Sequence, residues 1–309
     1  MKRALLIGLA VIGIAIIAVA VTAGPNLYRL TVGLKRYETT PPVLPVGLND
    51  KAILIFSKTN GFRDDDQIKA ANLALAHLAA ERGWTSYVTE NAAVFNPQQL
   101  KRFRVVVWNS VSGDVLTSDQ RQAFRTWLEQ GGGFVGLHGS GGDLKYAWRW
   151  YVDDLIGAQF IGHTMGPHFQ QATIIIEDPN HPAMRGLGST WVRTDEWYSF
   201  APNPRRKGYH VLATLDERTY HPWMKLLPFG RGTDVRMGAD HPVIWSHCVG
   251  NGRAFYSALG HSASTYSEPK HLQMIAGAIS WAAGFEGPRC VNGVETPDQA
   301  ATAADGGAR

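Results

Sequence analysis

The feature that most constrains the fold is an alternation of short apolar runs with amphipathic segments across residues 52–137. The apolar runs predict strands at 52–56, 84–89, 105–108 and 134–137. Between them, apolar side chains recur with the period of a helix at 68–82 and 118–130. Strands that alternate with helices form a parallel sheet with helices on both faces. We therefore predict an α/β domain with a mostly parallel central sheet.

The second half of the chain is less regular but still predicts one continuous domain. Further strands are expected at 172–177, 209–215, 242–249 and 252–259. The last two are separated by Gly250-Asn251, a dipeptide typical of a tight hairpin. A closing helix is expected at 270–283. We assign residues 51–285 to a single α/β domain with an elaborated second half.

The N-terminus carries an uncharged apolar stretch from Ala4 to Ala23. About 20 helical residues cross a bilayer core of about 30 Å. We predict an N-terminal transmembrane anchor at 1–24 and a proline-containing linker at 25–50, with the domain on the periplasmic side. The alternative is a signal peptide cleaved near Ala23, which gives a secreted protein. The small, polar residues 286–309 predict a disordered tail.

Composition excludes some classes of partner. The net charge is only +4, and no long Lys/Arg stripe is present, so we expect no nucleic-acid partner. The two cysteines, Cys248 and Cys290, are too few for a disulfide framework or a zinc ribbon, and they leave the compartment open. Cys248 falls inside a predicted strand, and we interpret it as a small core residue.

The strongest candidate for chemistry is His138, directly after the fourth predicted strand. Ligands of open parallel sheets bind beyond the carboxyl ends of the strands. His138 begins the glycine-rich turn His138-Gly-Ser-Gly-Gly-Asp143, and imidazole transfers protons near neutral pH. We predict that His138 is catalytic and that Asn109 and Gly139, at neighbouring strand ends, contact substrate. The alternative is that His138 only holds the turn.

Two histidines lie five residues apart in a loop rich in glycine and proline. We predict His163 as a catalytic partner of His138. The pair His163 and His168 is also a candidate for binding a divalent cation, although no carboxylate close in sequence completes such a site. No organic cofactor is expected.

A dense polar and aromatic cluster, Asp195-Glu-Trp-Tyr198, follows. Carboxylates beside aromatic rings are typical of sites that bind sugars, because the ring covers the C–H face and the acid accepts from hydroxyls. We predict Glu196 as a catalytic group, and Asp195, Tyr198 and the later His261 as substrate contacts. The alternative is a surface ion pair beside a core tryptophan.

The motifs together resemble the ThuA-like family, which is named for trehalose utilisation. The matching segments, in order, are Lys58-Thr-Asn-Gly-Phe-Arg63, Gly131-Gly-Gly-Phe-Val-Gly-Leu-His138, Gly157-Ala-Gln-Phe-Ile-Gly-His163, Asp178-Pro-Asn-His-Pro182, Asp195-Glu-Trp-Tyr198, His241-Pro-Val-Ile-Trp245 and Gly250-Asn-Gly-Arg-Ala-Phe-Tyr-Ser-Ala-Leu-Gly-His261. The resemblance implies a flavodoxin-like, three-layer fold of the class I glutamine amidotransferase-like superfamily. It also implies a role in carbohydrate metabolism.

Two details of the resemblance bear on activity. His138 stands in the region where amidotransferases carry their nucleophilic cysteine, so glutaminase chemistry is not expected. After Gly-Phe-Arg, family members commonly carry a histidine, whereas this chain has Asp64-Asp-Asp66. Either the activity differs or is lost, or an acid does the same proton work.

These observations favour a membrane-anchored enzyme that acts on a sugar or keto-sugar derivative by acid–base chemistry. His138 is the expected proton carrier, with Glu196 and His163 as its partners. Isomerisation or epimerisation needs no nucleophile, whereas hydrolysis lacks a clear second acid. The alternatives are a non-catalytic carbohydrate-binding module and an amidotransferase-like partner subunit.

Overall fold

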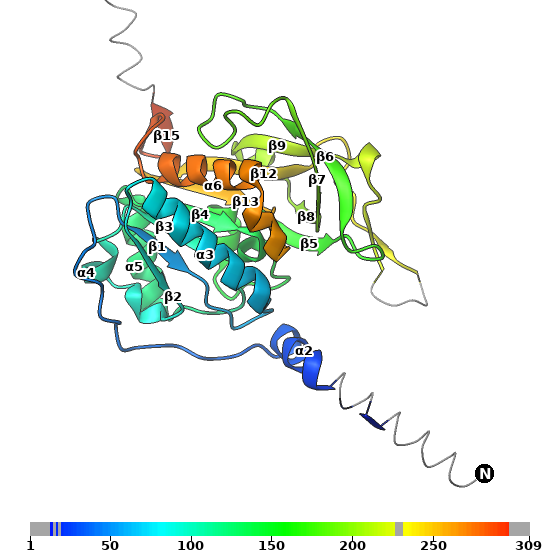
Figure 1. Cartoon of the computed structure of the whole chain (residues 1–309), viewed down its shortest axis with the longest axis horizontal. Helices are drawn as coiled ribbons and strands as arrows, with labels where there is room; N and C mark the ends of the chain where they lie inside the picture. The colour runs from blue at the N-terminus through cyan, green and yellow to red at the C-terminus, as the bar shows by residue number, and fades with distance from the viewer. Residues whose placement is uncertain (1–12, 15–16, 18–19, 226–230, 297–309) are drawn as a thin grey trace, which may run out of the picture.

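The computed structural model describes residues 13–14, 17, 20–225 and 231–296, and its centre is a nine-stranded sheet (Figure 1). The strand order is β2-β1-β3-β4-β13-β12-β9-β6-β7. Five strands pair in parallel, namely β2 (Ser86–Thr89), β1 (Ile53–Phe56), β3 (Val105–Asn109), β4 (Gly133–Leu137) and β13 (Gly252–Ser257). The others pair antiparallel, namely β12 (Pro242–Val249), β9 (His210–Asp216), β6 (Gln170–Ile176) and β7 (Thr190–Asp195). The predicted α/β fold and the β12–β13 hairpin are confirmed.

Helices cover both faces of the parallel half. Helices α3 (Asp65–Glu81) and α6 (Pro269–Ala282) lie side by side across one face (Figure 1). Helix α5 (Ser118–Glu129) covers the other, where the Phe124 ring packs 5.7 Å from Trp108 and 5.9 Å from Phe134. Successive strand residues point to opposite faces. The fully apolar strands predicted from the sequence are therefore buried on both sides.

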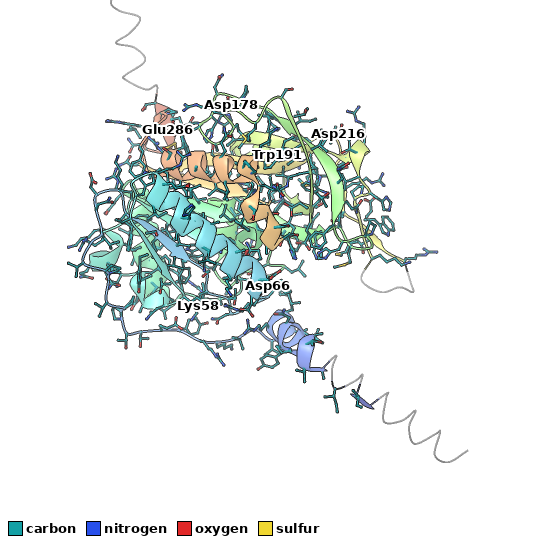
Figure 2. The ribbon with its side chains drawn as sticks, viewed as in Figure 1. Lys58, Asp66, Asp178, Trp191, Asp216 and Glu286 are labelled. Carbon is teal, nitrogen blue, oxygen red and sulfur yellow. A yellow bond between two sulfur atoms is a disulfide. The ribbon has the colours of Figure 1, made fainter. Side chains whose placement is uncertain are left out.

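Local capping sets where the helices begin. The Asp64 side chain accepts a hydrogen bond of 3.0 Å from the Gln67 backbone and caps α3, so α3 begins three residues before the predicted start. Asp66 marks this end of the helix in Figure 2. Thr117 and Gln120 form a reciprocal capping box at the start of α5. Asp64 therefore has a structural role before any role in a site.

The antiparallel half contains strands that the sequence did not predict. Strand β7 alternates buried and exposed residues, but its buried members include Arg193 and Asp195. Strands β5 (Gln159–His163) and β8 (Tyr198–Ala201) form a separate two-stranded sheet. Only Glu196 and Trp197 separate β7 from β8. The chain therefore turns from the main sheet to the small sheet at Glu196.

The N-terminal segment lies along the domain. Helix α2 (Gly24–Thr31) precedes it, and the backbone N–H of Leu34 donates to the carbonyl of Asn60 at 2.7 Å. The Gln99 side chain donates to the carbonyl of Pro42 at 2.6 Å, so the predicted linker is docked on the domain. Across the described residues, no helix is both long enough and apolar enough to cross a membrane. Most of the predicted anchor falls outside the described residues.

The C-terminal segment corrects two predictions. Cys248 of β12 is bonded to Cys290 in a disulfide, so it is not simply a small core residue. Cys290 belongs to a hairpin of β14 (Arg289–Val291) and β15 (Val294–Thr296). The tail predicted from residue 286 therefore includes ordered strands, and residues 297–309 lie outside the described part of the chain.

Candidate functional site

His138 ends the β4 strand in a strained conformation. Its φ is +43°, in the left-handed region that costs a non-glycine residue about 1–2 kcal/mol. The sharp turn directs the imidazole to the carboxyl edge of the sheet, where its Nδ1 lies 2.9 Å from the carbonyl oxygen of Ala258. That oxygen only accepts, so Nδ1 donates and Nε2 faces the site.

Glu196 is the centre of the site, with one pair of imidazoles at each carboxylate oxygen. Its Oε2 lies 2.9 Å from His261 Nδ1 and 3.3 Å from His138 Nε2. Its Oε1 lies 2.8 Å from His163 Nδ1 and in contact with His168 Nε2. Four histidines that are far apart in the sequence thus meet one carboxylate. The three predicted catalytic residues are all in this cluster.

Burial separates the two pairs. The His138 side chain is 5% exposed and the Glu196 side chain 4%, whereas those of His163 and His168 are 22% and 30% exposed. The His261 side chain is intermediate, at 14%. His138 and Glu196 therefore form the floor of the site, and His163 and His168 form its rim.

The charges of the cluster stabilise one another. Burial alone raises the pKa of Glu196, but the hydrogen bonds from the four imidazoles outweigh it and hold that pKa well below its usual value. Burial lowers the pKa of His163 and of His261. The hydrogen bond to Glu196 and the negative charge of Glu196 raise both values by more, so both pKa values lie above the ordinary value. An ionised carboxylate with proton-holding imidazoles is a suitable centre for moving protons.

Two further side chains border the cluster. The Tyr198 hydroxyl lies 3.1 Å from His138 Nε2, and burial raises its pKa well above the ordinary value. Asp64 Oδ2 lies 3.6 Å from His261 Nε2. Asp64, the first of the three acids that follow Arg63, therefore faces the cluster from the start of α3.

Three predicted substrate contacts lie elsewhere. Asp195 is fully buried and accepts from the backbone N–H groups of Gly260 (2.9 Å) and His261 (3.2 Å), so it fixes the loop that carries His261. Asn109 is also fully buried and donates to the carbonyl of Ile68 at 3.2 Å. Gly139 packs its backbone beside Ser110. Asp195 and Asn109 thus hold the backbone around the site.

Sequence reasoning missed how much the rim residues matter. His168 was considered only as a cation ligand, and its contact with Glu196 crosses 28 positions of sequence. A histidine beside glycine and proline was the only local signal. Convergence on Glu196 depends on the pairing of β5 with β8, which brings His163 opposite Tyr198.

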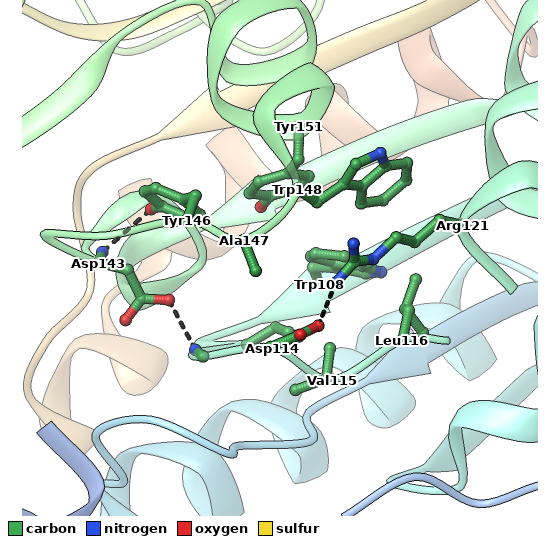
Figure 3. Close-up of a pocket in the computed structure, with 12 residues that line it drawn as sticks. Trp108, Asp114, Val115, Leu116, Arg121, Asp143, Tyr146, Ala147, Trp148 and Tyr151 are labelled. Carbon is green, nitrogen blue, oxygen red and sulfur yellow. Dashed lines mark hydrogen bonds and ion pairs between the residues drawn. The ribbon is translucent and has the colours of Figure 1, made fainter. Parts of the chain in front are cut away.

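The described residues line one small cavity and one wider groove. The small cavity of about 30 Å³ lies among Trp108, Tyr146, Trp148 and Tyr151, with an Arg121–Asp114 ion pair at one end (Figure 3). The wider groove of about 420 Å³ is lined by Phe169, hydroxyl groups and Arg193. The Phe169 ring lies 4.4 Å from the His168 ring and 5.2 Å from the His261 ring. The wider groove therefore adjoins the rim of the site.

The turn after β4 offers no hydroxyl or thiol nucleophile to the site. Ser140 is buried and donates to the carbonyl of Trp108 at 2.8 Å. Cys248 lies in the disulfide. The residue presented at the turn is the imidazole of His138, so the cluster is equipped for proton transfer.

Comparison with solved structures shows which proteins share this fold. A putative ThuA-like protein from Bacteroides uniformis is 24% identical, with a TM-score of 0.63 over 79% of this chain and 95% of that one. One from Parabacteroides merdae is 16% identical, with a TM-score of 0.55 over 81% and 98%. At these identities the likeness shows the fold, which is class I glutamine amidotransferase-like. No match was found among curated proteins.

The family is shown by a separate comparison. The family model described as ThuA, trehalose utilisation, matches residues 52–282. This range contains the whole nine-stranded sheet and every residue of the histidine cluster. The chain therefore belongs to the ThuA family, which is related to carbohydrate use.

Proposed function

We propose that this protein is an enzyme that acts on a sugar or keto-sugar derivative by acid–base chemistry at the Glu196 cluster. The observation that carries the proposal is a buried, ionised carboxylate in contact with four imidazoles at the carboxyl edge of the sheet. Titratable groups with strongly shifted pKa values concentrate at functional sites. The carbohydrate class comes from the family, whose description is trehalose utilisation.

The wider groove supports a sugar as the ligand. The Phe169 ring is 41% exposed and adjoins His168, so it offers an apolar surface for the C–H face of a sugar. Thr194, Ser262 and Ser264 line the same groove and supply hydroxyl groups. A sugar in the groove would have part of its ring within reach of the exposed histidines.

The positions of the histidines change the roles expected from the sequence. His138 is nearly fully buried, and its Nε2 already faces Tyr198, His261 and Glu196, so it is poorly placed to reach a substrate. His163 is more exposed and shares a proton with Glu196. We assign proton transfer with the substrate to His163 and His168, and the organisation of the floor to His138.

The reaction class that needs only these groups is proton transfer beside a carbonyl. A rim imidazole takes the proton from the carbon next to the carbonyl, the C–H electron pair forms the C–C double bond, and the carbonyl π pair moves onto its oxygen to give an enediolate. Return of the proton to the same carbon from the other face epimerises the sugar. Return to the former carbonyl carbon, with the hydroxyl proton passing from one enediolate oxygen to the other, isomerises it. Glu196 stabilises the imidazolium between the two transfers.

The direct test is solvent exchange. We expect the full chain in D₂O to introduce deuterium next to the carbonyl of fructose or of a 3-keto-glucoside, observed by proton NMR. Glu196→Gln and His163→Gln should each slow exchange by about 100-fold or more, the usual scale of general acid–base catalysis. His77→Gln is the matched control, because His77 is an exposed histidine of α3, 76% accessible, outside the site.

The other outcomes distinguish the alternatives. Sugars that raise the melting temperature without any deuterium exchange would identify a binding module and contradict the catalytic proposal. Absence of both effects for trehalose, glucose and the keto-sugars would contradict a sugar ligand.

The disulfide supports a location outside the cytoplasm. Stable disulfides form in the periplasm and outside the cell and are rare in the cytosol. Cys248 and Cys290 are joined, which agrees with the anchor or signal peptide predicted from the N-terminal sequence. We therefore propose that the domain works in an oxidising compartment, held by its N-terminal segment or released from it.

A further inference from the structure

Hydrogen bonding fixes the proton on one nitrogen of His138. Nδ1 lies 2.9 Å from the carbonyl oxygen of Ala258, and a carbonyl accepts but never donates. The neutral imidazole therefore carries its proton on Nδ1, and Nε2 presents a lone pair. That lone pair points into a space bounded by Glu196 Oε2 at 3.3 Å and His261 Nδ1 at 3.0 Å.

His261 has the complementary arrangement. Its Nδ1 lies 2.9 Å from Glu196 Oε2, and its Nε2 faces Asp64 Oδ2 at 3.6 Å. With a carboxylate near each nitrogen, the neutral ring can carry its proton on Nε2 and present the Nδ1 lone pair to a cation beside Glu196. Three atoms of the kind that ligate metals thus meet at one point, with the Tyr198 hydroxyl 3.1 Å from His138 Nε2, and either a shared cation or bound protons would stabilise them there.

The separations within this triangle match those of metal ligands. Ligand atoms at 2.0–2.1 Å from one ion, at angles between octahedral and tetrahedral, lie roughly 2.9–3.4 Å apart. The three separations are 2.9, 3.0 and 3.3 Å. We infer that the floor of the site binds one divalent transition-metal ion through His138 Nε2, His261 Nδ1 and Glu196 Oε2. The inference shares its residues with the proposed function and gives the same site a cofactor.

The partners around the triangle are those that metal ligands use. A ligating histidine usually donates its other N–H to a carbonyl or carboxylate, and a ligating carboxylate is itself hydrogen-bonded. Ala258 O and Asp64 fill the first role, and the contacts of His163 and His168 with Glu196 Oε1 fill the second. Asp64 thereby gains a function that the sequence left open.

The other possible triad, with His163, His168 and Glu196, fits less well. His163 Nδ1 lies 2.9 Å from the carbonyl oxygen of Thr164 as well as beside Glu196, so this nitrogen must carry a proton. A protonated nitrogen cannot ligate. The cation therefore belongs at Oε2, and the His163–His168 pair considered from the sequence holds the carboxylate in place.

The donor set selects the metal. Two imidazoles and one carboxylate suit Zn²⁺, Fe²⁺, Mn²⁺ or Co²⁺, whereas Ca²⁺ and Mg²⁺ prefer all-oxygen sites. Three protein ligands leave coordination positions open, as in catalytic rather than structural zinc sites. The open side is available to a substrate oxygen that enters from the rim.

The test measures metal binding without any sugar. The full chain is stripped with a chelator and titrated with Zn²⁺ by calorimetry, and Co²⁺ loading is followed by visible absorption. We expect one ion per chain, with the Co²⁺ bands of a low-coordinate nitrogen and oxygen site. His138→Ala and His261→Ala should weaken Zn²⁺ binding beyond the roughly 10- to 100-fold that loss of an outer partner costs, whereas Asp64→Asn and His163→Ala should stay within that range.

Several results would overturn the inference. Absence of stoichiometric Zn²⁺ and Co²⁺ binding by the wild type contradicts it, whatever the variants do, and means that protons hold the triangle together. A larger loss in His163→Ala than in His138→Ala moves the ion to the other oxygen. The proposed function is separable, since metal binding without sugar exchange contradicts only that proposal, and sugar exchange by a protein that binds neither Zn²⁺ nor Co²⁺ contradicts only this one.

Discussion

The two pairs of imidazoles that meet Glu196 come from different parts of the molecule. His138 and His261 follow the neighbouring parallel strands β4 and β13, whose last residues, Leu137 and Ser257, are paired. His163 ends β5 of the small antiparallel sheet, and His168 follows it in the loop. The first pair lies in the buried floor and the second at the exposed rim. The parallel half of the fold thus supplies the two buried imidazoles, and the small antiparallel sheet supplies the two more exposed ones.

The two halves also differ in the interactions that hold each of them together. The parallel half rests on strands buried on both faces, with aromatic packing such as Phe124 against Trp108. The antiparallel half buries charges, including Arg193 and Asp195 at 3.1 Å, and carries the disulfide. Loss of one partner of a buried ion pair leaves an unpaired charge, and loss of a disulfide frees the unfolded chain, so both are expected to be costly. The predictions below test whether the halves differ in this way.

The largest expected effect on stability is loss of the disulfide. Cys248 and Cys290 are 42 residues apart, and closing a loop of that length stabilises a fold by about 3–4 kcal/mol. We expect the double variant Cys248→Ser, Cys290→Ser to lower the free energy of unfolding by about this amount, measured by denaturant titration. Thiol labelling of the wild-type protein taken from cells should find both cysteines oxidised.

The control for this prediction is the reduced wild type, which should resemble the double variant. If the reduced wild type and the double variant both unfold at the same denaturant concentration as the oxidised wild type, the antiparallel half does not depend on its disulfide. Free thiols in freshly prepared protein would contradict the oxidising compartment.

A smaller effect is expected at the strained turn of the parallel half. His138 has a φ of +43°, which glycine adopts without strain. We expect His138→Gly to be more stable than His138→Ala by about 1 kcal/mol, although both lack the imidazole. Equal stability of the two variants in chemical denaturation would show that the turn relaxes. The parallel half would then not impose the geometry of the site.

The parallel half was predictable from the sequence because each strand is a continuous apolar run and each helix has a clear period. Strand β7 escaped prediction because its inward residues include Arg193 and Asp195, which do not look buried until their partners are known. The small sheet was not predicted because β5 and β8 are short and partly polar. The sequence indicated His138, Glu196 and His163 as residues suited to proton transfer. Their contacts with one another depend on strand pairing between distant segments, which the sequence does not reveal.

Two predicted substrate contacts lie buried in the structure for an equally physical reason. Asn109 was expected to contact substrate because it follows a strand near the site, and Asp195 because it stands beside aromatic residues. The structure turns them inward, where Asp195 holds the backbone of His261 and Asn109 holds α3. A polar residue at a strand end can hold a loop as readily as a ligand, and sequence alone does not separate the two.

The central claim is that Glu196 holds the two pairs of imidazoles together, and histidine NMR of the chelator-treated protein tests it most directly. Since the pKa values of His163 and His261 are raised, their protonated forms stabilise the fold fully below pH 6.5, and this stabilisation is lost as the pH rises through the raised values. We predict that both residues titrate above 6.5 in the wild type and that both pKa values fall in Glu196→Gln, because burial still lowers them while the hydrogen bond to Glu196 and its charge, their main upward causes, are removed. Titration curves that Glu196→Gln leaves unchanged would contradict the account.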